Sequence, residues 1–168
     1  MPELIYLGIG LEDVNNSMCT CPTCTAEINK YTRTGLVIRW ANEVTAIMRA
    51  WAKDVNLGRE IYFPFIAYYE TAQAPAEYNS QTGKYEPIDS SLILNEYSPV
   101  LYCRIDSNWN VPWEDEKNSA YMYGLEEWKA CAKSLMFYNY TNDFSRSFEW
   151  WDSLYVITQN YGLAVKEN

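Results

Sequence analysis

The chain has 168 residues, of which 48% are hydrophobic and 21% charged, a composition typical of one folded domain and not of a disordered segment. Its net charge of −9 disfavours nucleic acid and anionic membranes as partners, because phosphate groups are bound by basic surfaces. No run of apolar residues approaches the roughly 18 that a membrane-spanning helix requires. Neutral ligands, sugars among them, are compatible with this charge.

The first half of the chain predicts a strand, a helix and a second strand. Residues 4–10 are a short apolar run that ends in glycines, which is typical of a buried strand. Residues 35–55 carry apolar side chains every three or four positions and predict a helix. Residues 60–70 predict the second strand, although Pro64 removes one backbone donor from it. The long polar connection that follows is rich in turn residues, as in a hairpin or an excursion from the domain.

The second half repeats the alternation of strands and helices. Strands are predicted at residues 100–106 and 134–143, and helices at residues 119–133 and 148–162, the last one closed by Gly162. Strands that alternate with helices predict an α/β domain with a parallel sheet. The nearly continuous apolar character of these strands is expected where helices cover the sheet or surround a barrel.

Each predicted strand leads into an acidic residue at its C-terminal end. In parallel α/β sheets these ends lie on one side of the molecule, where ligands bind, so four acid-bearing loops would line one cleft. The alternative is a structural role, because Asp and Asn are also favoured as helix N-caps in such loops. The acids are Glu12, Asp13, Glu70, Asp106 and Asp143.

Aromatic and amide side chains fall in the same loops. Sugar rings stack their apolar faces on Trp and Tyr while their hydroxyl groups bond to polar side chains, so this mixture favours a carbohydrate cleft. Alternate residues of a strand face the core, however, which leaves a packing role open for about half of them. The candidate ligand-binding residues are Tyr69, Arg104, Trp109, Trp113, Tyr140, Asn142 and Asp143. Core positions on helical faces are predicted for Trp40, Trp51, Trp128 and Tyr155.

Three of the five cysteines, Cys19, Cys21 and Cys24, lie within six positions of the first predicted loop. A closed zinc site needs four ligands, and since the chain has no histidine the fourth would be Cys103, Cys131 or a carboxylate. A redox pair at a helix N-terminus is a second interpretation, although the long loop and the missing final hairpin are unlike thioredoxin. Free thiols or a disulfide that braces the loop are the third. We assign no metal and expect no cofactor.

A resemblance to a known family rests on several motifs in order. They are a strand ending in Gly-x-Gly, an acidic Asn-rich loop, C-x-C-x-x-C, a helix "LVIRWANEVTAIMRAW", a strand into "YYE", then "VLYCRID" and "EEWKACAKSLMFYNYTNDF". The chain resembles, over almost its whole length, an uncharacterised domain family of large bacterial proteins, many from gut bacteria. Those domains look like glycoside-hydrolase TIM barrels and are similar to alpha-glucuronidases. A full (β/α)₈ barrel takes roughly 200 residues or more, so the resemblance implies a single α/β domain over residues 1–168 that is about half of a barrel.

The resemblance implies a hydrolase that uses two carboxyl groups, one to protonate the leaving oxygen and one as nucleophile or base. The candidates for these roles are Glu12, Asp13, Glu70 and Asp106. The alternatives are a non-catalytic carbohydrate-binding module and a structural domain whose cysteines hold a metal. A partial barrel would also have two open sheet edges, which predicts pairing with a second copy. The resemblance suggests an exported or cell-surface location in bacteria.

Overall fold

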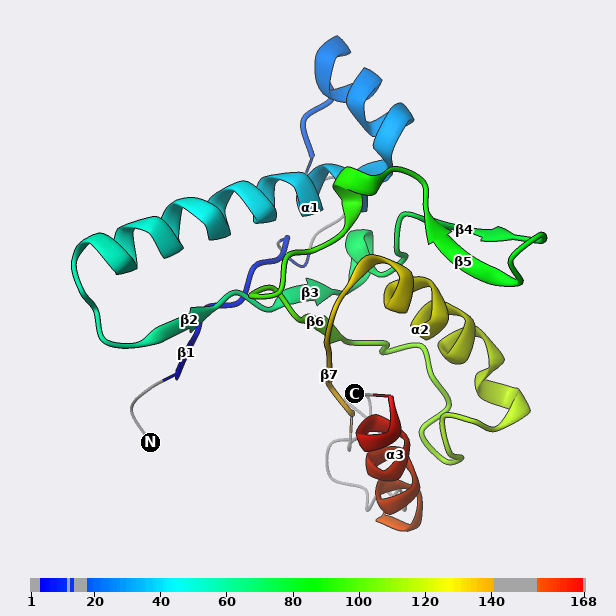
Figure 1. Ribbon diagram of the computed structural model, residues 1–168. Helices are drawn as coiled ribbons and strands as arrows, with labels where there is room; N and C mark the ends of the chain where they lie inside the picture. Colours follow the sequence, from blue (N-terminus) through cyan, green and yellow to red (C-terminus); the bar gives the residue numbers. More distant parts are fainter. Residues whose placement is uncertain (1–3, 12, 14–17, 141–153, 168) are drawn as a thin grey trace.

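The computed structural model describes residues 4–11, 13, 18–140 and 154–167. These residues form a mixed α/β fold in which mostly parallel strands are flanked by helices (Figure 1). The predicted alternation of strands and helices with parallel pairing is therefore confirmed. The sheets of the described residues are short and do not close into a barrel. None of the described helices is both long and apolar enough to cross a membrane.

Five short parallel strands fill four side-by-side positions in chain order, because β2 and β3 follow one another in one position. The first strand β1 pairs with β2, while β3, β6 and β7 form a three-stranded sheet in that order. A parallel bridge between Ile9 and Phe65 joins the two groups. The bounds are Leu4–Tyr6 for β1, Glu60–Tyr62 for β2, Phe65–Ala67 for β3, Val100–Tyr102 for β6 and Leu135–Phe137 for β7.

The strand predicted at residues 60–70 is divided into β2 and β3 by Phe63 and Pro64. Proline has no N–H to donate, so one bond towards the first strand is missing at Pro64. Its carbonyl still accepts from the N–H of Ile9 at 2.7 Å, and Phe63 and Phe65 donate to the opposite neighbour. The proline therefore interrupts the ladder on one side without separating the segments.

Three helices accompany the strands: α1 (Pro22–Asp54), α2 (Ser119–Cys131) and α3 (Leu154–Lys166). The helix predicted at residues 35–55 is the second part of α1, which is kinked at Thr32 and has a further segment before the kink. The prediction that Gly162 ends the last helix is wrong, because α3 continues through it to Lys166. Helical hydrogen bonds outweigh the weak preference of one glycine for a helix end.

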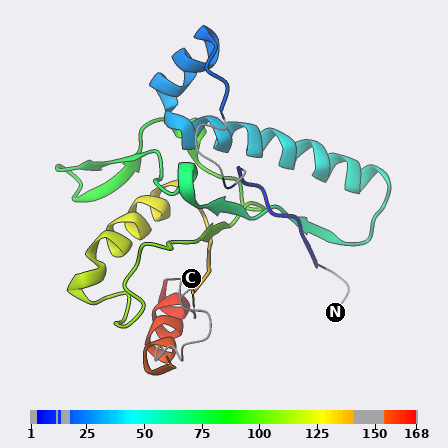
Figure 2. The same ribbon diagram turned by 180° about the vertical axis from the view of Figure 1, so that it is seen from behind.

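The polar connection after β3 contains an antiparallel hairpin of β4 (Ala76–Asn79) and β5 (Lys84–Pro87). Its turn places Gly83 at a φ of 69°, which glycine adopts without strain. The hairpin packs beside α2 and extends away from the sheet in both views (Figures 1 and 2). Of the two possibilities that the sequence left open, the hairpin is correct.

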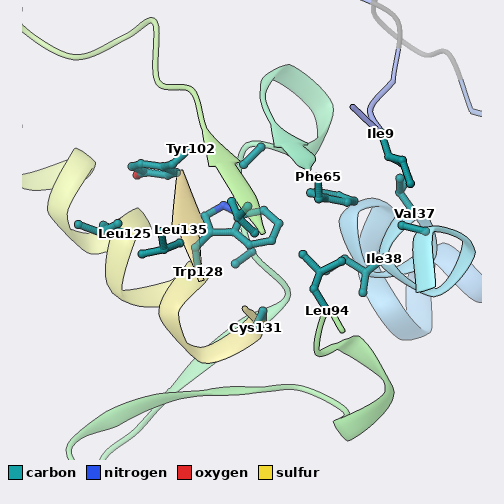
Figure 3. Close-up of a cluster of buried hydrophobic side chains, with 14 of the residues drawn as sticks. Ile9, Val37, Ile38, Phe65, Leu94, Tyr102, Leu125, Trp128, Cys131 and Leu135 are labelled. Carbon is teal, nitrogen blue, oxygen red and sulfur yellow. The ribbon is translucent and has the colours of Figure 1, made fainter. Parts of the chain in front are cut away.

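The core lies between the sheet and the helices α1 and α2 (Figure 3). The rings of Phe65 and Trp128 meet at its centre, with centroids 5.5 Å apart, and both side chains are fully buried. The buried face of α1 is built largely from small residues, so the helix lies close to the sheet. Its buried residues are Thr34, Gly35, Val37, Ile38, Ala41 and Thr45.

Of the four helical aromatic residues predicted in the core, only Trp128 is buried. The predictions for Trp40, Trp51 and Tyr155 are wrong, because about half of each side chain is exposed. The apolar spacing of α1 fits two neighbouring stripes of the helix, and packing against the sheet selected the stripe with the smaller residues.

Candidate functional site

A cavity of about 510 Å³ lies at the C-terminal ends of β3 and β6 and is bounded on one side by α2. We name it the rim cleft. The sheet contributes residues just beyond each strand, and the 3₁₀ turn η1 (Tyr69–Thr71) and α2 contribute the rest. The lining residues are Tyr68, Tyr69, Ala72, Gln73, Cys103, Arg104, Ile105, Asp106, Ala120, Tyr123, Gly124 and Glu127. Three predicted site residues, Tyr69, Arg104 and Asp106, are thus brought together.

Arg104 and Asp106 form a two-pronged ion pair in the rim cleft. The Arg104 Nε donates to Asp106 Oδ1 at 2.6 Å, and its Nη2 donates to Oδ2 at 2.5 Å. These hydrogen bonds lower the pKa of Asp106, which is therefore ionised at neutral pH. The Arg104 side chain is only 18% exposed, so this ion pair with two hydrogen bonds holds both charged groups in place at the wall of the cleft.

Glu127 brings a second carboxyl group into the rim cleft from α2. Burial raises its pKa, and the nearby charge of Arg104 opposes that effect only in part. The cleft therefore holds two carboxyl groups whose pKa values are shifted in opposite directions, which is the arrangement that separates an acid from a base.

Sequence reasoning missed Glu127, because it considered only acids at strand ends. A usable signal was the glycine three positions earlier in the same helix. Glycine is unfavourable inside a helix and often marks a close approach of another element. A Cβ on Gly124 would lie 2.5 Å from the Tyr102 hydroxyl oxygen and 2.9 Å from Arg104 Nη1. The glycine thus lets Arg104 lie against the helix that carries Glu127.

Aromatic rings surround the rim cleft on the side of the strand ends. Tyr69 is 46% exposed, and its ring lies 5.7 Å from that of Tyr68. The rings of Trp109 and Tyr140 are stacked, with centroids 5.4 Å apart and an angle of 10° between their planes. The Tyr140 hydroxyl oxygen lies 3.1 Å from the Sγ of Cys103, a lining residue, so this stacked pair adjoins the cleft.

The other predicted acids have different positions. Glu12, Asn142 and Asp143 lie outside the described residues. Asp13 is exposed, and its charge adds to the effect of burial in raising the pKa of Tyr68, which places it near the same rim. Glu70 is ion-paired with Arg33 and lines a separate cavity of about 370 Å³. The strand-end acids therefore do not all face one cleft.

Trp113 lies in the core instead of the cleft, and only 3% of it is exposed. Its ring is stacked against those of Tyr121 and Phe137, with centroids 4.8 and 5.5 Å away. Its backbone N–H donates to the side chain of Asn160 in α3 at 3.0 Å. A ring that is almost wholly buried has no exposed face for a sugar, so the predicted ligand contact of Trp113 is corrected to a packing role.

In the described part of the chain, the three cysteines near the start of α1 are the one group of possible metal ligands whose atoms lie close together. The Sγ atoms of Cys19, Cys21 and Cys24 all lie within 4.8 Å of one another. None of the five cysteines is in a disulfide, so the predicted brace by a disulfide is not present in this structure. Cys103 and Cys131 are buried elsewhere and do not supply a fourth ligand to this group.

The comparison with known proteins assigns a family but no activity. Over residues 1–168 the chain matches the family described as "Domain of unknown function (DUF4838)". No curated protein and no solved structure matches it.

Proposed function

The chain belongs to the DUF4838 family of domains of unknown function, and from its own geometry we propose that the rim cleft is the carbohydrate site of a glycoside hydrolase-like domain. The observation that carries the proposal is the rim cleft itself. At the ends of parallel strands it is lined by an exposed tyrosine, by the ion pair of Arg104 and Asp106, and by Glu127, a second carboxyl group whose pKa is raised. Such strand ends are where α/β folds bind their ligands.

The fold supports the same proposal at the level of topology. Four neighbouring parallel segments in chain order are the arrangement of consecutive units in a (β/α)₈ barrel. We infer that residues 1–168 are a partial barrel of this kind. On this view the sheet face opposite to α1 and α2 is the barrel interior, and the rim cleft belongs to the catalytic end of the barrel.

In binding, the exposed ring of Tyr69 would stack against a sugar ring, while Arg104 and Gln73 would bond to its hydroxyl groups. The net charge of −9 disfavours strongly anionic polymers, so a neutral glycan is the expected ligand class.

In hydrolysis, Glu127 would act as the general acid. It donates its proton to the glycosidic oxygen as the bond to the anomeric carbon breaks, and the ionised Asp106 stabilises the positive charge that develops there. Water supplies the new hydroxyl group at the anomeric carbon and returns one proton to Glu127. The net reaction is glycoside plus water to two sugars.

Binding is tested by a glycan-array screen followed by calorimetric titration of the best glycan. We expect Tyr69→Ala to weaken binding about tenfold, which corresponds to about 1.4 kcal/mol. Tyr78→Ala is the matched control, because Tyr78 is exposed on the hairpin and does not line the cleft. Equal effects of the two variants, or no glycan bound by the wild type, would contradict the proposal.

Catalysis is tested by release of reducing sugar from the same glycan. We expect Glu127→Gln to abolish turnover while binding is kept. Because burial raises the pKa of Glu127, its acid form persists to higher pH than in an ordinary glutamate. Turnover should therefore fall only as the pH rises above the usual glutamate range. Glycan binding without turnover by the wild type would instead identify a carbohydrate-binding module.

A further inference from the structure

Cys19, Cys21 and Cys24 form a group of thiols that the proposed carbohydrate site does not use. They lie at the start of α1, whose first turns stand away from the sheet (Figure 1), and none of them lines the rim cleft. We propose that these three cysteines form a three-thiolate site for Zn²⁺, with its fourth coordination position open to solvent.

The distances between the sulfur atoms are close to those of a zinc site. With Zn–S bonds of about 2.3 Å, tetrahedral geometry places the sulfur atoms roughly 3.8 Å apart. The three Sγ atoms all lie within 4.8 Å of one another, so movements of about an ångström or less would bring them into place. Cys19 and Cys21 are exposed and Cys24 is partly exposed, so an ion can enter and the side chains have room to adjust.

The N-terminus of α1 favours the thiolate form that a metal requires. Cys21 is the N-cap residue, and its Sγ accepts from the backbone N–H of Cys24 at 3.5 Å. Pro22 occupies the start of the helix, where its fixed φ suits the first turn. The positive end of the helix dipole stabilises an anion at this position.

Metal binding by the group must release protons. Zn²⁺ binds cysteine as the thiolate, so an ion at the centre of the three sulfur atoms would take the place of their thiol protons.

The third cysteine favours a metal over a dithiol redox pair. A redox pair requires only Cys21 and Cys24 and gives no account of Cys19, whose sulfur completes the triangle. Thiolates are soft ligands that prefer Zn²⁺ and similar ions to Mg²⁺ or Ca²⁺. No fourth Cys, Asp or Glu among the described residues joins the group, and the chain has no histidine, so solvent is the natural fourth ligand.

The experiment uses the reduced full chain, freed of metal and titrated with Zn²⁺, and with Co²⁺ as a spectroscopic probe. We expect one ion per chain, proton release on binding and a thiolate-to-cobalt charge-transfer band. Replacing all three cysteines by serine should abolish each signal. Thr20→Ala is the matched control, because it changes the same loop without removing a sulfur, and it should bind as the wild type does.

The proposal is overturned if the reduced wild type binds no more Zn²⁺ than the triple serine variant. It is also overturned if Cys19→Ser alone leaves the affinity and the cobalt spectrum unchanged, because the site would then be a two-thiol pair. Circular dichroism of each variant separates loss of the site from loss of the fold. Glycan binding is measured on the same samples, so a failed metal site is distinguishable from a failed rim cleft.

Discussion

At the scale of single residues, Gly124 is the glycine at which an added Cβ would meet its neighbours most closely. Gly124 lies inside α2, where the hydroxyl of Tyr102 and the guanidinium of Arg104 occupy the space that a Cβ would need. Both neighbours are held by other partners, since Tyr102 donates to the carbonyl of Tyr121 at 2.7 Å and Arg104 is paired with Asp106. The absence of a side chain here is therefore what allows the strand end and the helix to form one wall of the rim cleft.

We predict that Gly124→Ala destabilises the protein although alanine is the better helix former. Overpacking costs about 1–3 kcal/mol, and because the nearest atom would lie only 2.5 Å from the new Cβ, we expect a cost in the upper part of that range, above the gain of about 1 kcal/mol in helix propensity. Gly162→Ala in α3 is the control, because nothing lies within 4 Å of its Cβ position, and it should stabilise by about 0.5–1 kcal/mol. Urea unfolding of both variants measures this, and a Gly124→Ala protein as stable as the Gly162→Ala protein would refute the explanation.

At the scale of elements, α1 is two helical segments joined at one strained residue. Thr32 has a φ of 66° and a ψ of 167°, a region of backbone conformation that is almost restricted to glycine. Its Oγ1 accepts from the N–H of Gly35 at 3.1 Å, as an N-cap side chain does at the third helical position. Thr32 therefore begins the segment that packs on the sheet while holding the earlier segment at an angle.

Substitutions at Thr32 should distinguish the stabilisation by its N-cap hydrogen bond from the destabilisation by its strained backbone. Thr32→Ala loses the cap oxygen and keeps the strain, so we expect a loss of about 1 kcal/mol in the free energy of unfolding. Thr32→Ser keeps the cap and should match the wild type. Thr32→Gly relieves strain of about 1–3 kcal/mol and should be at least as stable as the wild type. Thermal unfolding gives this order, and an alanine variant equal to the serine variant would rule out the cap.

At the scale of the whole molecule, burial divides the described chain into a packed centre and projecting parts. The centre is the sheet with α2 and the second part of α1, where most of the large fully buried side chains lie. No residue in the range 22–31, before the kink, is fully buried. When the bridge between Ile9 and Phe65 joins the two groups of parallel strands, β1 and β7 are the outermost described strands and so form open edges. Pairing of copies through these edges stays a prediction.

Hydrogen exchange should report this division. Amides in β3, β6 and α2 open only with the whole core, so we expect them to exchange slowest. Residues 22–31 have few buried contacts and should exchange faster than residues 34–45 of the same helix. Mass spectrometry of peptides after timed exchange measures both. Uniform protection along α1 would show that the kink at Thr32 does not divide the helix into two independently opening parts.

The acidic residues show how much of the rim cleft can be predicted from the sequence. Asp106 and Arg104 follow a strand directly, and chain direction alone places them at the edge where α/β folds bind ligands. Glu70 follows another strand by the same rule, yet the 3₁₀ turn at Tyr69 directs it towards Arg33 instead. Glu127 has no strand-end signal, and only the packing of α2 brings it to the cleft. Local sequence patterns do not predict which cavity such a side chain reaches.

Strand and helix order, parallel pairing and the grouping of Cys19, Cys21 and Cys24 follow from the sequence, because they depend on periodicity, chain direction and short spacing. The tertiary structure alone decided which stripe of α1 is buried, why Trp113 packs inside, and which carboxyl groups share a cavity. These outcomes depend on contacts between residues far apart in the chain. Their free energies are comparable for several arrangements until the whole core is packed.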